Sequence, residues 1–408
     1  MKKHKRVVIT GYGVSTPFGF GINYNWDNLI KAKSCIKFIT EFDTNELRTK
    51  FAGTLAKIDP DTYPKKINPK NLDKTTLYTL LTIKETLESA KLKPEEKNSI
   101  GLILGTGFGT ILSKESHHFR VMGEKKPPFP LIIPKAMDNA AASEAAIFFG
   151  LNGINQTVFS ACSSGLNAIG NAYRLIKDGY ETAIIAGGVD TPVSFWTIQN
   201  WNKLRVLSTY NKNPEKASKP FSKDRDGFVL SEGAGFLMLE CYDNAIQRNA
   251  PILAEIIGFG STCDAKHITA PGIEQQCKAI EKAIVEAGIQ KKEIDYINAH
   301  GTATKLNDLC ETEVIKKVFK DYAYKIPVSS TKSQLGHTIG ASGALEVIFS
   351  IKMMQSEIIL PTINLDEQDE LCDLDYVPNK PIKHKVKYFL KNSFGFGGSN
   401  AALIIKKV

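Results

Sequence analysis

Short apolar runs rich in β-branched residues alternate along the chain with longer stretches that carry an apolar stripe at helical spacing. The short runs predict buried strands at residues 6–10, 100–104, 183–186, 235–240, 254–259, 296–299 and 402–406. The striped stretches predict helices at residues 74–90, 167–178, 274–287 and 310–319. This alternation indicates an α/β fold with buried sheets.

The pattern also repeats weakly, because four motifs in the first part of the chain have counterparts in the same order later on. Most of these motifs end a predicted strand in glycine or another small residue, which lets a turn tighten and a ligand approach the backbone. We therefore expect two similar α/β units, residues 1–250 and 251–408, with functional groups at their strand ends. The paired segments are 8–13 with 256–260, 102–107 with 296–301, 158–165 with 328–333, and 184–188 with 389–398.

The composition, with 42% hydrophobic and 23% charged residues among 408, is typical of a soluble globular protein. Residues 145–173 are uncharged, but their asparagines and glycines would leave polar groups unsatisfied in a bilayer, so we expect them in the protein interior. The apolar run at the N-terminus is too short for a secretory signal. A cytoplasmic protein without membrane association is expected.

The formal net charge is +9, and the basic residues are spread along the chain. This charge fits either simple solubility or an acidic partner or anionic substrate, and no nucleic-acid-binding motif accompanies it. The seven cysteines show no C-x-x-C pair and no zinc-type spacing, so we expect free thiols and no metal. A cysteine on a chemically distinctive loop is then a candidate nucleophile.

Cys162 is that candidate, because it follows a predicted strand and precedes Gly165 and a predicted helix. This arrangement places the thiol at a helix N-terminus, where free N–H groups and the helix dipole favour thiolate. The same geometry serves the nucleophile elbow of hydrolases. Taken alone, Cys162 could equally be a small buried apolar residue, as most free cysteines are.

Two histidines strengthen the catalytic interpretation, because His300 and His337 each lie on a glycine-flanked loop after a predicted strand. A pair of neutral imidazoles can donate hydrogen bonds to one thioester oxygen while negative charge develops there, as enolate chemistry requires. They could instead bind zinc, but no third ligand has metal-site spacing and Lys332 lies close in the sequence.

Charged residues and a glycine-rich turn surround these loops. Asp308 and Glu311 begin a predicted helix and are expected chiefly to cap it. Glu346 is placed to pair with Lys332 and hold the His337 loop. The turn at residues 392–400 carries Phe394 and Phe396 and leads into a strand rather than a helix, so it predicts a mobile aromatic gate rather than a phosphate cradle.

In combination these motifs resemble the β-ketoacyl-acyl carrier protein synthases of the elongating type, close to synthase II, over essentially the whole chain. The resemblance rests on residues 160–165, 224–235, both histidine loops and the terminal glycine turn. It implies the thiolase fold, a duplicated αβαβα arrangement of five layers, in a homodimer. It also implies a Cys-His-His triad without a metal or other cofactor, with substrates carried on the phosphopantetheine of an acidic acyl carrier protein.

The resemblance implies a role for each matching position. Cys162 would accept the acyl group, and His300 and His337 would promote loss of carbon dioxide from malonyl-carrier protein. The backbone N–H groups of Cys162 and Phe396 would form the oxyanion hole. Further implied positions are a malonyl pocket at Thr302 and Thr304, a supporting pair at Lys332 and Glu346, and carrier docking at Lys65, Lys66, Lys125, Lys126 and Arg205.

Two positions depart from the family's pattern in the direction of larger side chains. Phe108 matches an acyl-pocket position that is often a smaller aliphatic residue, and Trp201 matches a pocket edge that is usually a smaller aromatic. They indicate a specialised enzyme for short or unusual acyl chains. The alternatives are a degradative thiolase, which would need a second cysteine near residues 394–398, and a non-catalytic chain-length partner subunit, which would typically lack the nucleophile.

Overall fold

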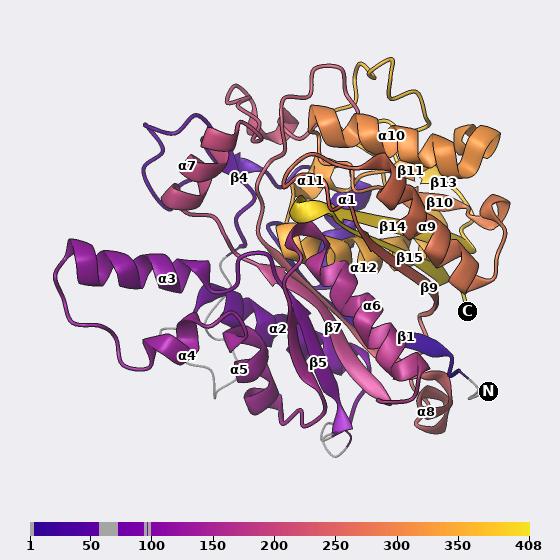
Figure 1. Ribbon diagram of the computed structural model, residues 1–408, viewed down its shortest axis with the longest axis horizontal. Coiled ribbons are helices and arrows are strands. Elements are labelled where there is room, and N and C mark those ends of the chain that lie inside the picture. The colour runs from indigo at the N-terminus through magenta and orange to yellow at the C-terminus, as the bar shows by residue number, and fades with distance from the viewer. Residues whose placement is uncertain (1–3, 57–71, 94–95, 97–98) are drawn as a thin grey trace.

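The computed structural model describes residues 4–56, 72–93, 96 and 99–408, and in these ranges eleven strands form one mixed sheet (Figure 1). The short strand β2 (Gly19–Phe20) extends from β1 at one side. Along the sheet the order is β6 (Asn155–Val158), β5 (Gly101–Gly105), β7 (Ala183–Asp190), β8 (Gly233–Cys241), β1 (Val7–Thr16), β9 (Ala254–Cys263), β15 (Ser399–Lys406), β14 (Tyr388–Gly395), β10 (Tyr296–Asn298) and β11 (Val328–Ser329).

The sheet consists of two halves with the same topology. When the strands of each half are numbered in chain order, they lie across the sheet in the order third, second, fourth, fifth, first. Two strands that pair parallel in one half have counterparts that pair parallel in the other, and the same holds for the antiparallel pairs. The four sequence motifs that repeat fall on equivalent strands: β1 and β9, β5 and β10, β6 and β11, β7 and β14. This correspondence supports two units, and we propose the division near residue 250 that the sequence predicts.

Helices cover both halves and also separate them. The outer face of the first half packs against α2 and α5, and that of the second against α9 and α10, while α6 and α12 lie between the halves (Figure 1). The five-layered αβαβα arrangement of the thiolase fold is thus confirmed. These helices are α2 (Lys74–Ser89), α5 (Ala140–Phe149), α6 (Ser164–Lys177), α9 (Ile273–Ala287), α10 (Lys305–Phe319) and α12 (Ser342–Ser356).

The connecting segments add shorter elements. Two of them, α3 and α4, lie in a segment that projects from the first half, residues 111–136, which we call the arm (Figure 1). The two halves are continuous through antiparallel pairing of residues 7–9 with 254–256. The shorter elements are α1 (Ile22–Ile30), α3 (Ile111–His118), α4 (Ile132–Ala136), α7 (Phe195–Leu204), α8 (Tyr242–Gln247), α11 (Lys332–Leu335), β3 (Lys37–Phe38), β4 (Phe51–Ala52), β12 (Ile358–Ile359) and β13 (Ile382–Lys383).

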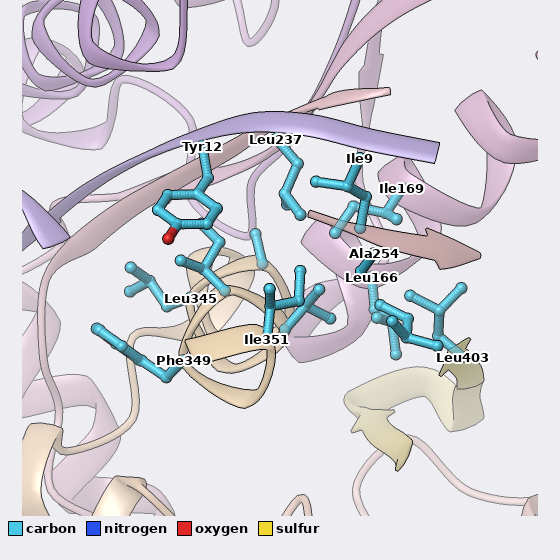
Figure 2. Packing of buried hydrophobic residues seen from close by; sticks show 14 of the residues in the cluster. Ile9, Tyr12, Leu166, Ile169, Leu237, Ala254, Leu345, Phe349, Ile351 and Leu403 are labelled. Atoms are coloured by element: carbon cyan, nitrogen blue, oxygen red, sulfur yellow. The ribbon is translucent and has the colours of Figure 1, made fainter. Parts of the chain in front are cut away.

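The largest hydrophobic core surrounds the two central helices. Figure 2 shows Leu166 and Ile169 of α6 with Leu345 and Phe349 of α12, next to side chains from strands of both halves. Because α12 faces protein on nearly every side, it is apolar almost all round. Among the described residues no helix is both long and apolar enough to span a membrane, and the uncharged residues 145–173 fold as α5, β6 and α6.

One close contact fixes the distance between α6 and the second half of the sheet. A Cβ atom added to Gly170 on α6 would lie 2.2 Å from the ring of Phe259 on β9, which is itself 2% exposed. The helix can therefore approach the strand only where it carries no side chain.

We predict that Gly170→Ala lowers the free energy of unfolding by about 1–3 kcal/mol through overpacking. Helix propensity alone predicts the opposite sign, a gain of about 0.5–1 kcal/mol. Denaturant unfolding measures the difference. The penalty should shrink in a Phe259→Leu background, where the added methyl group gains room, and a stabilised single variant would contradict the packing argument.

Candidate active site

Cys162 lies in the turn between β6 and α6, as the sequence predicts. A 3-10 helix, Ala161–Ser163, holds the turn, and Ala161 adopts a left-handed φ of 52°. The Ser164 hydroxyl secures this strained backbone, because it accepts a hydrogen bond from the Ser160 N–H at 2.9 Å and donates one to the Ala161 carbonyl at 2.7 Å. Cys162 is 8% exposed and lines the cavity.

His300 lies on the turn after β10, and carboxylates of α10 hold this turn. The N–H groups of His300 and Gly301 each donate to Glu311 at 2.8 Å, and the Thr302 N–H donates to Asp308 at 3.1 Å. Burial raises the pKa of Asp308 to about 6, although Arg225 opposes the shift, and burial also raises the pKa of Glu311.

The expected role of these two acids is corrected by this geometry. The N-cap of α10 is Thr304, and no side chain caps it. Asp308 and Glu311 bind the backbone of the preceding turn instead, because both lie on the buried face of the helix that packs under His300. They bind the backbone of the His300 turn rather than cap the helix, although Asp308 does lie in the first turn of α10, as expected.

His337 is fixed in one tautomer by its own loop. Its Nδ1 accepts a hydrogen bond from the Ile339 N–H at 3.2 Å and lies 3.0 Å from the Ser342 hydroxyl. Because Nδ1 acts as an acceptor, the ring proton resides on Nε2. This Nε2–H is buried and has no hydrogen-bond partner among the described residues, so it is available to a ligand.

The fold brings the three predicted residues together. Sγ of Cys162 and one ring nitrogen each of His300 and His337 lie within 4.8 Å of one another, and the two imidazole centroids are 5.4 Å apart. This spacing would also suit a metal ion. However, Lys332 and Lys391 act on both histidines electrostatically, and a second and third positive charge disfavour a bound cation.

Burial controls the protonation of the triad. It lowers the pKa of both histidines well below the usual value, and Lys332 and Lys391 lower it further, so both rings are neutral at pH 7. Burial also raises the pKa of Cys162 to about 12, although Lys332 and the N–H groups of Phe396 and Cys162 oppose the shift. Burial thus opposes the thiolate that the N–H groups at the helix N-terminus favour.

Lys332 and Glu346 form the expected ion pair, with 2.5 Å between Nζ and Oε1 and both side chains almost fully buried. The other carboxylate oxygen lies 2.7 Å from the ammonium group of Lys391, which the sequence interpretation missed. The available signal was a lysine inside the apolar strand at residues 388–395, where a charge is out of place.

The glycine-rich turn closes over Cys162. Its backbone comes so near that a Cβ atom on Gly395 would lie 2.7 Å from the Ser160 carbonyl. The Phe394 ring centroid is 5.9 Å from that of His300, and the Phe396 ring is 5.8 Å from Trp201. Both phenylalanines line the cavity.

A cavity of about 440 Å³ leads from the triad to the surface. Thr302 and Thr304 line it with their hydroxyl oxygens 3.0 Å apart, and exposed Arg205 lies at its mouth. Trp201 lines the cavity, whereas Phe108 is absent from the described lining and packs edge-on against Trp201 with 6.2 Å between ring centroids. Phe108 therefore contacts Trp201, and Trp201 contacts the cavity.

Two of the predicted docking residues can be placed away from this mouth. Lys125 and Lys126 are exposed on the arm near α4, and neither lines the cavity. Lys126 already pairs with Glu124 at 3.0 Å. Lys65 and Lys66 lie outside the described residues.

Comparison with known proteins identifies the family. Residues 4–245 match the N-terminal domain of β-ketoacyl synthases, and residues 253–366 match their C-terminal domain. The chain belongs to the β-ketoacyl synthase family. A relative from Synechocystis sp., named 3-oxoacyl-acyl-carrier-protein synthase 2, is 39% identical over 99% of this chain and 98% of its own length.

Solved structures of synthases agree with this assignment. A β-ketoacyl synthase from Burkholderia phymatum superposes with a TM-score of 0.92 at 32% identity and covers 99% of this chain and 100% of its own. A ketosynthase bound to a hexaketide, in complex with its type II polyketide acyl-carrier protein, gives 0.90 at 29% identity with the same coverage.

Asp190 at the end of β7 is a second buried charge of this synthase that the sequence interpretation missed. Its carboxylate accepts hydrogen bonds from the N–H groups of Gly107 and Gly340, both at 2.7 Å, and from Phe108 at 3.0 Å. Burial raises its pKa to about 6. One side chain therefore joins the loop after β5 to the His337 loop, a long-range contact that no local pattern indicates.

The lowered histidine pKa values give a prediction for NMR. In the native protein, ¹⁵N-labelled His300 and His337 should remain neutral as the pH falls through 6.5, with His337 protonated on Nε2. The unfolded chain takes up protons in that range and the native state does not, so stability should decrease as the pH falls below 6.5. Protonation of either ring above pH 6.5 would contradict the assigned electrostatics.

Proposed function

We propose that this chain condenses an acyl thioester held on Cys162 with malonyl-acyl carrier protein, with loss of carbon dioxide, to give β-ketoacyl-acyl carrier protein. The observation that carries the proposal is the meeting of one thiol and two neutral imidazoles within 4.8 Å at the inner end of a cavity. Membership of the β-ketoacyl synthase family supports it over the full length.

In the first half-reaction, Sγ of Cys162 attacks the thioester carbonyl of the acyl donor. The N–H groups of Cys162 and Phe396, which both favour negative charge on the sulfur, would bind the developing oxyanion. The thiol loses its proton as it attacks, and the departing phosphopantetheine sulfur takes that proton up. The acyl group is left on Cys162.

In the second half-reaction, the malonyl thioester occupies the cavity next to Thr302 and Thr304. N–H donors on His300 and His337 bind its carbonyl oxygen, so the bond to the carboxylate can break and its electrons form an enolate. The enolate carbon attacks the acyl carbonyl on Cys162, the carbon–sulfur bond breaks, and the released thiolate takes up a proton. No step needs a metal or another cofactor, and we propose that none is used.

The substrate is proposed to arrive on an acidic acyl carrier protein. A net charge of +9 and an exposed arginine, Arg205, at the mouth of the cavity support this partner. A structural relative in complex with its carrier protein supports it further. Arg205 is the docking residue that the geometry favours, while Lys125 and Lys126 would contact a carrier only beyond the mouth.

A homodimer is proposed from the arm and the adjoining sheet edge. Phe119, Met122, Leu131 and Ile133 on the arm are 58–72% exposed, and exposed apolar side chains that gather on one segment are typical of an interaction surface. Strand β6 ends the sheet, and its outer side is unpaired among the described residues. A second copy would cover both features with one interface.

The alternatives from the sequence are less well supported. A non-catalytic chain-length partner would not need the thiol and both imidazoles in one cluster, yet all three are present and buried. A degradative thiolase would need a second cysteine near residues 394–398, and this segment reads Phe-Gly-Phe-Gly-Gly.

Substitution of the triad separates its two tasks. Cys162→Ala should abolish condensation but retain decarboxylation of malonyl-carrier protein, because no acyl-enzyme forms while the donors remain. His300→Ala and His337→Ala should each slow decarboxylation roughly a hundred- to thousand-fold. Carbon dioxide release and product formation measure the two tasks. A histidine variant that decarboxylates at the parental rate would remove that residue from the proposed mechanism.

Chain length tests the aromatic cluster beside Cys162. Trp201 lines the cavity and Phe108 packs behind it, so a long acyl tail would have to displace both rings, at a cost of about 1–3 kcal/mol. We expect fast acylation by short acyl-carrier proteins and slow acylation by long ones. Phe108→Ala should extend the accepted length, since each buried methylene contributes about 0.8 kcal/mol.

Phe42→Ala is the matched control for this experiment. Phe42 packs against the same cluster but pairs with Phe195 and not with Trp201. Its truncation should leave the length preference unchanged. A parent enzyme that already accepts long chains as fast as short ones would contradict the role of Phe108.

A further inference from the structure

Lys391 is a fully buried lysine that the proposed mechanism does not use. It lies on β14, and its side chain shares a face of the strand with Phe389, which packs in the core around α12. An ammonium group at such a position is costly unless oxygen atoms surround it. The groups that contact this ammonium group should therefore show why the strand has a lysine at a position where its pattern predicts an apolar residue.

The ammonium group contacts the backbone that leads to His300. Strand β14 runs parallel to β10 with Lys391 opposite Asn298, and Nζ donates to the Ala299 carbonyl at 3.0 Å. The N–H of the same peptide unit, that of His300, donates to Glu311 at 2.8 Å. The peptide plane before His300 is thus held at its carbonyl by a cation and at its N–H by a carboxylate.

The second contact joins Lys391 to the ionic network. Its Nζ lies 2.7 Å from Oε2 of Glu346, whose Oε1 binds Lys332 at 2.5 Å. The charged and titratable groups that act on Lys391 or on which it acts are Glu346 on α12, Lys332 on α11, Glu311 on α10, and the two histidines. Removal of the ammonium group would leave one oxygen of a buried carboxylate without a cation.

We propose that Lys391 is a positioning residue for His300, because it fixes the Ala299–His300 peptide and balances the charge of Glu346. This inference rests on the proposed function, since it concerns the decarboxylation step that His300 supports. Loss of a hydrogen bond to a charged group typically costs ten- to hundred-fold, and we expect a decrease of about that size in kcat with little change in KM.

A pH dependence follows from the same environment. Burial lowers the pKa of Lys391 to about 8, although Glu346 opposes the shift. The cation is present below this pH and is lost above it, so decarboxylation should decline as the pH rises through about 8. The thiol of Cys162, with a pKa of about 12, does not titrate in that range.

The experiment compares Lys391→Met with Lys177→Met, which removes an ammonium group paired with Glu286 at 2.6 Å outside the site. For each protein we would measure decarboxylation of malonyl-carrier protein across pH 7 to 9, acylation of Cys162, and Tm. In Lys391→Met, the rate of decarboxylation should fall far more than the rate of acylation, and the decline of decarboxylation at alkaline pH should disappear. Ammonium chloride should partly restore the decarboxylation rate of this variant, whereas equimolar sodium chloride should not. Lys177→Met should behave as the parent.

The outcomes are distinguishable. An inactive parent would overturn the proposed function, whereas an active parent with an unimpaired Lys391→Met would overturn this inference alone. Equal losses of acylation and decarboxylation in a folded variant would also overturn it, because a merely structural role predicts them. Should Lys391→Met fail to fold, the parent decides: a decarboxylation rate that does not decline through about pH 8 contradicts the proposal.

Discussion

The site depends on a backbone contact between the two halves that leaves no room for side chains. A Cβ atom on Gly165, at the start of α6, would lie 2.5 Å from the Gly340 carbonyl, and one on Gly188 would lie 2.4 Å from the same oxygen. The Asp190 carboxylate accepts the Gly340 N–H from the opposite half. This contact places His337 close to Cys162. If a side chain at one of these glycines pushed the His337 loop away, the imidazole would lie too far from the thiol for the two to act on the same substrate.

The second determinant is a set of charges held away from water. Glu346 between two lysines, and Glu311 under the His300 turn, keep the imidazole loops in place, while burial and the two lysines keep both rings neutral. Neutral rings serve the proposed chemistry because they donate hydrogen bonds to an enolate without holding a full positive charge. The same burial makes the thiol a weak acid, so the sulfur must lose its proton as it attacks, and the protein must bind the oxyanion that this attack forms.

Much of this arrangement follows from local sequence patterns. Glycine-ended apolar runs predicted the strands, their repetition predicted equivalent strands in two halves, and the loops of Cys162, His300 and His337 meet as expected. Features set by tertiary contact were less accessible. The helix α10 begins five residues before its predicted start.

Buried polar partners were the hardest features to predict. Lys391 and Asp190 contact segments far away in the sequence, and nothing in their neighbours specifies those contacts. Asp308 and Glu311 fitted a helix-capping pattern, but the fold turns them toward the preceding loop instead. Phe108, which the resemblance places on the acyl channel, contacts Trp201, and Trp201 lines the cavity. In each case the neighbouring residues fit the expected strand or helix, but tertiary packing determines which group the side chain contacts.

The most direct test of the account follows one acyl group through the protein by mass spectrometry. The parent protein would be loaded with a short acyl-carrier protein, digested, and compared with a sample chased with malonyl-carrier protein. The account predicts an acyl adduct on the peptide that contains Cys162, its disappearance during the chase, and one carbon dioxide released for each β-ketoacyl product. An adduct on any other cysteine, or an adduct on Cys162 that survives the chase, would contradict it.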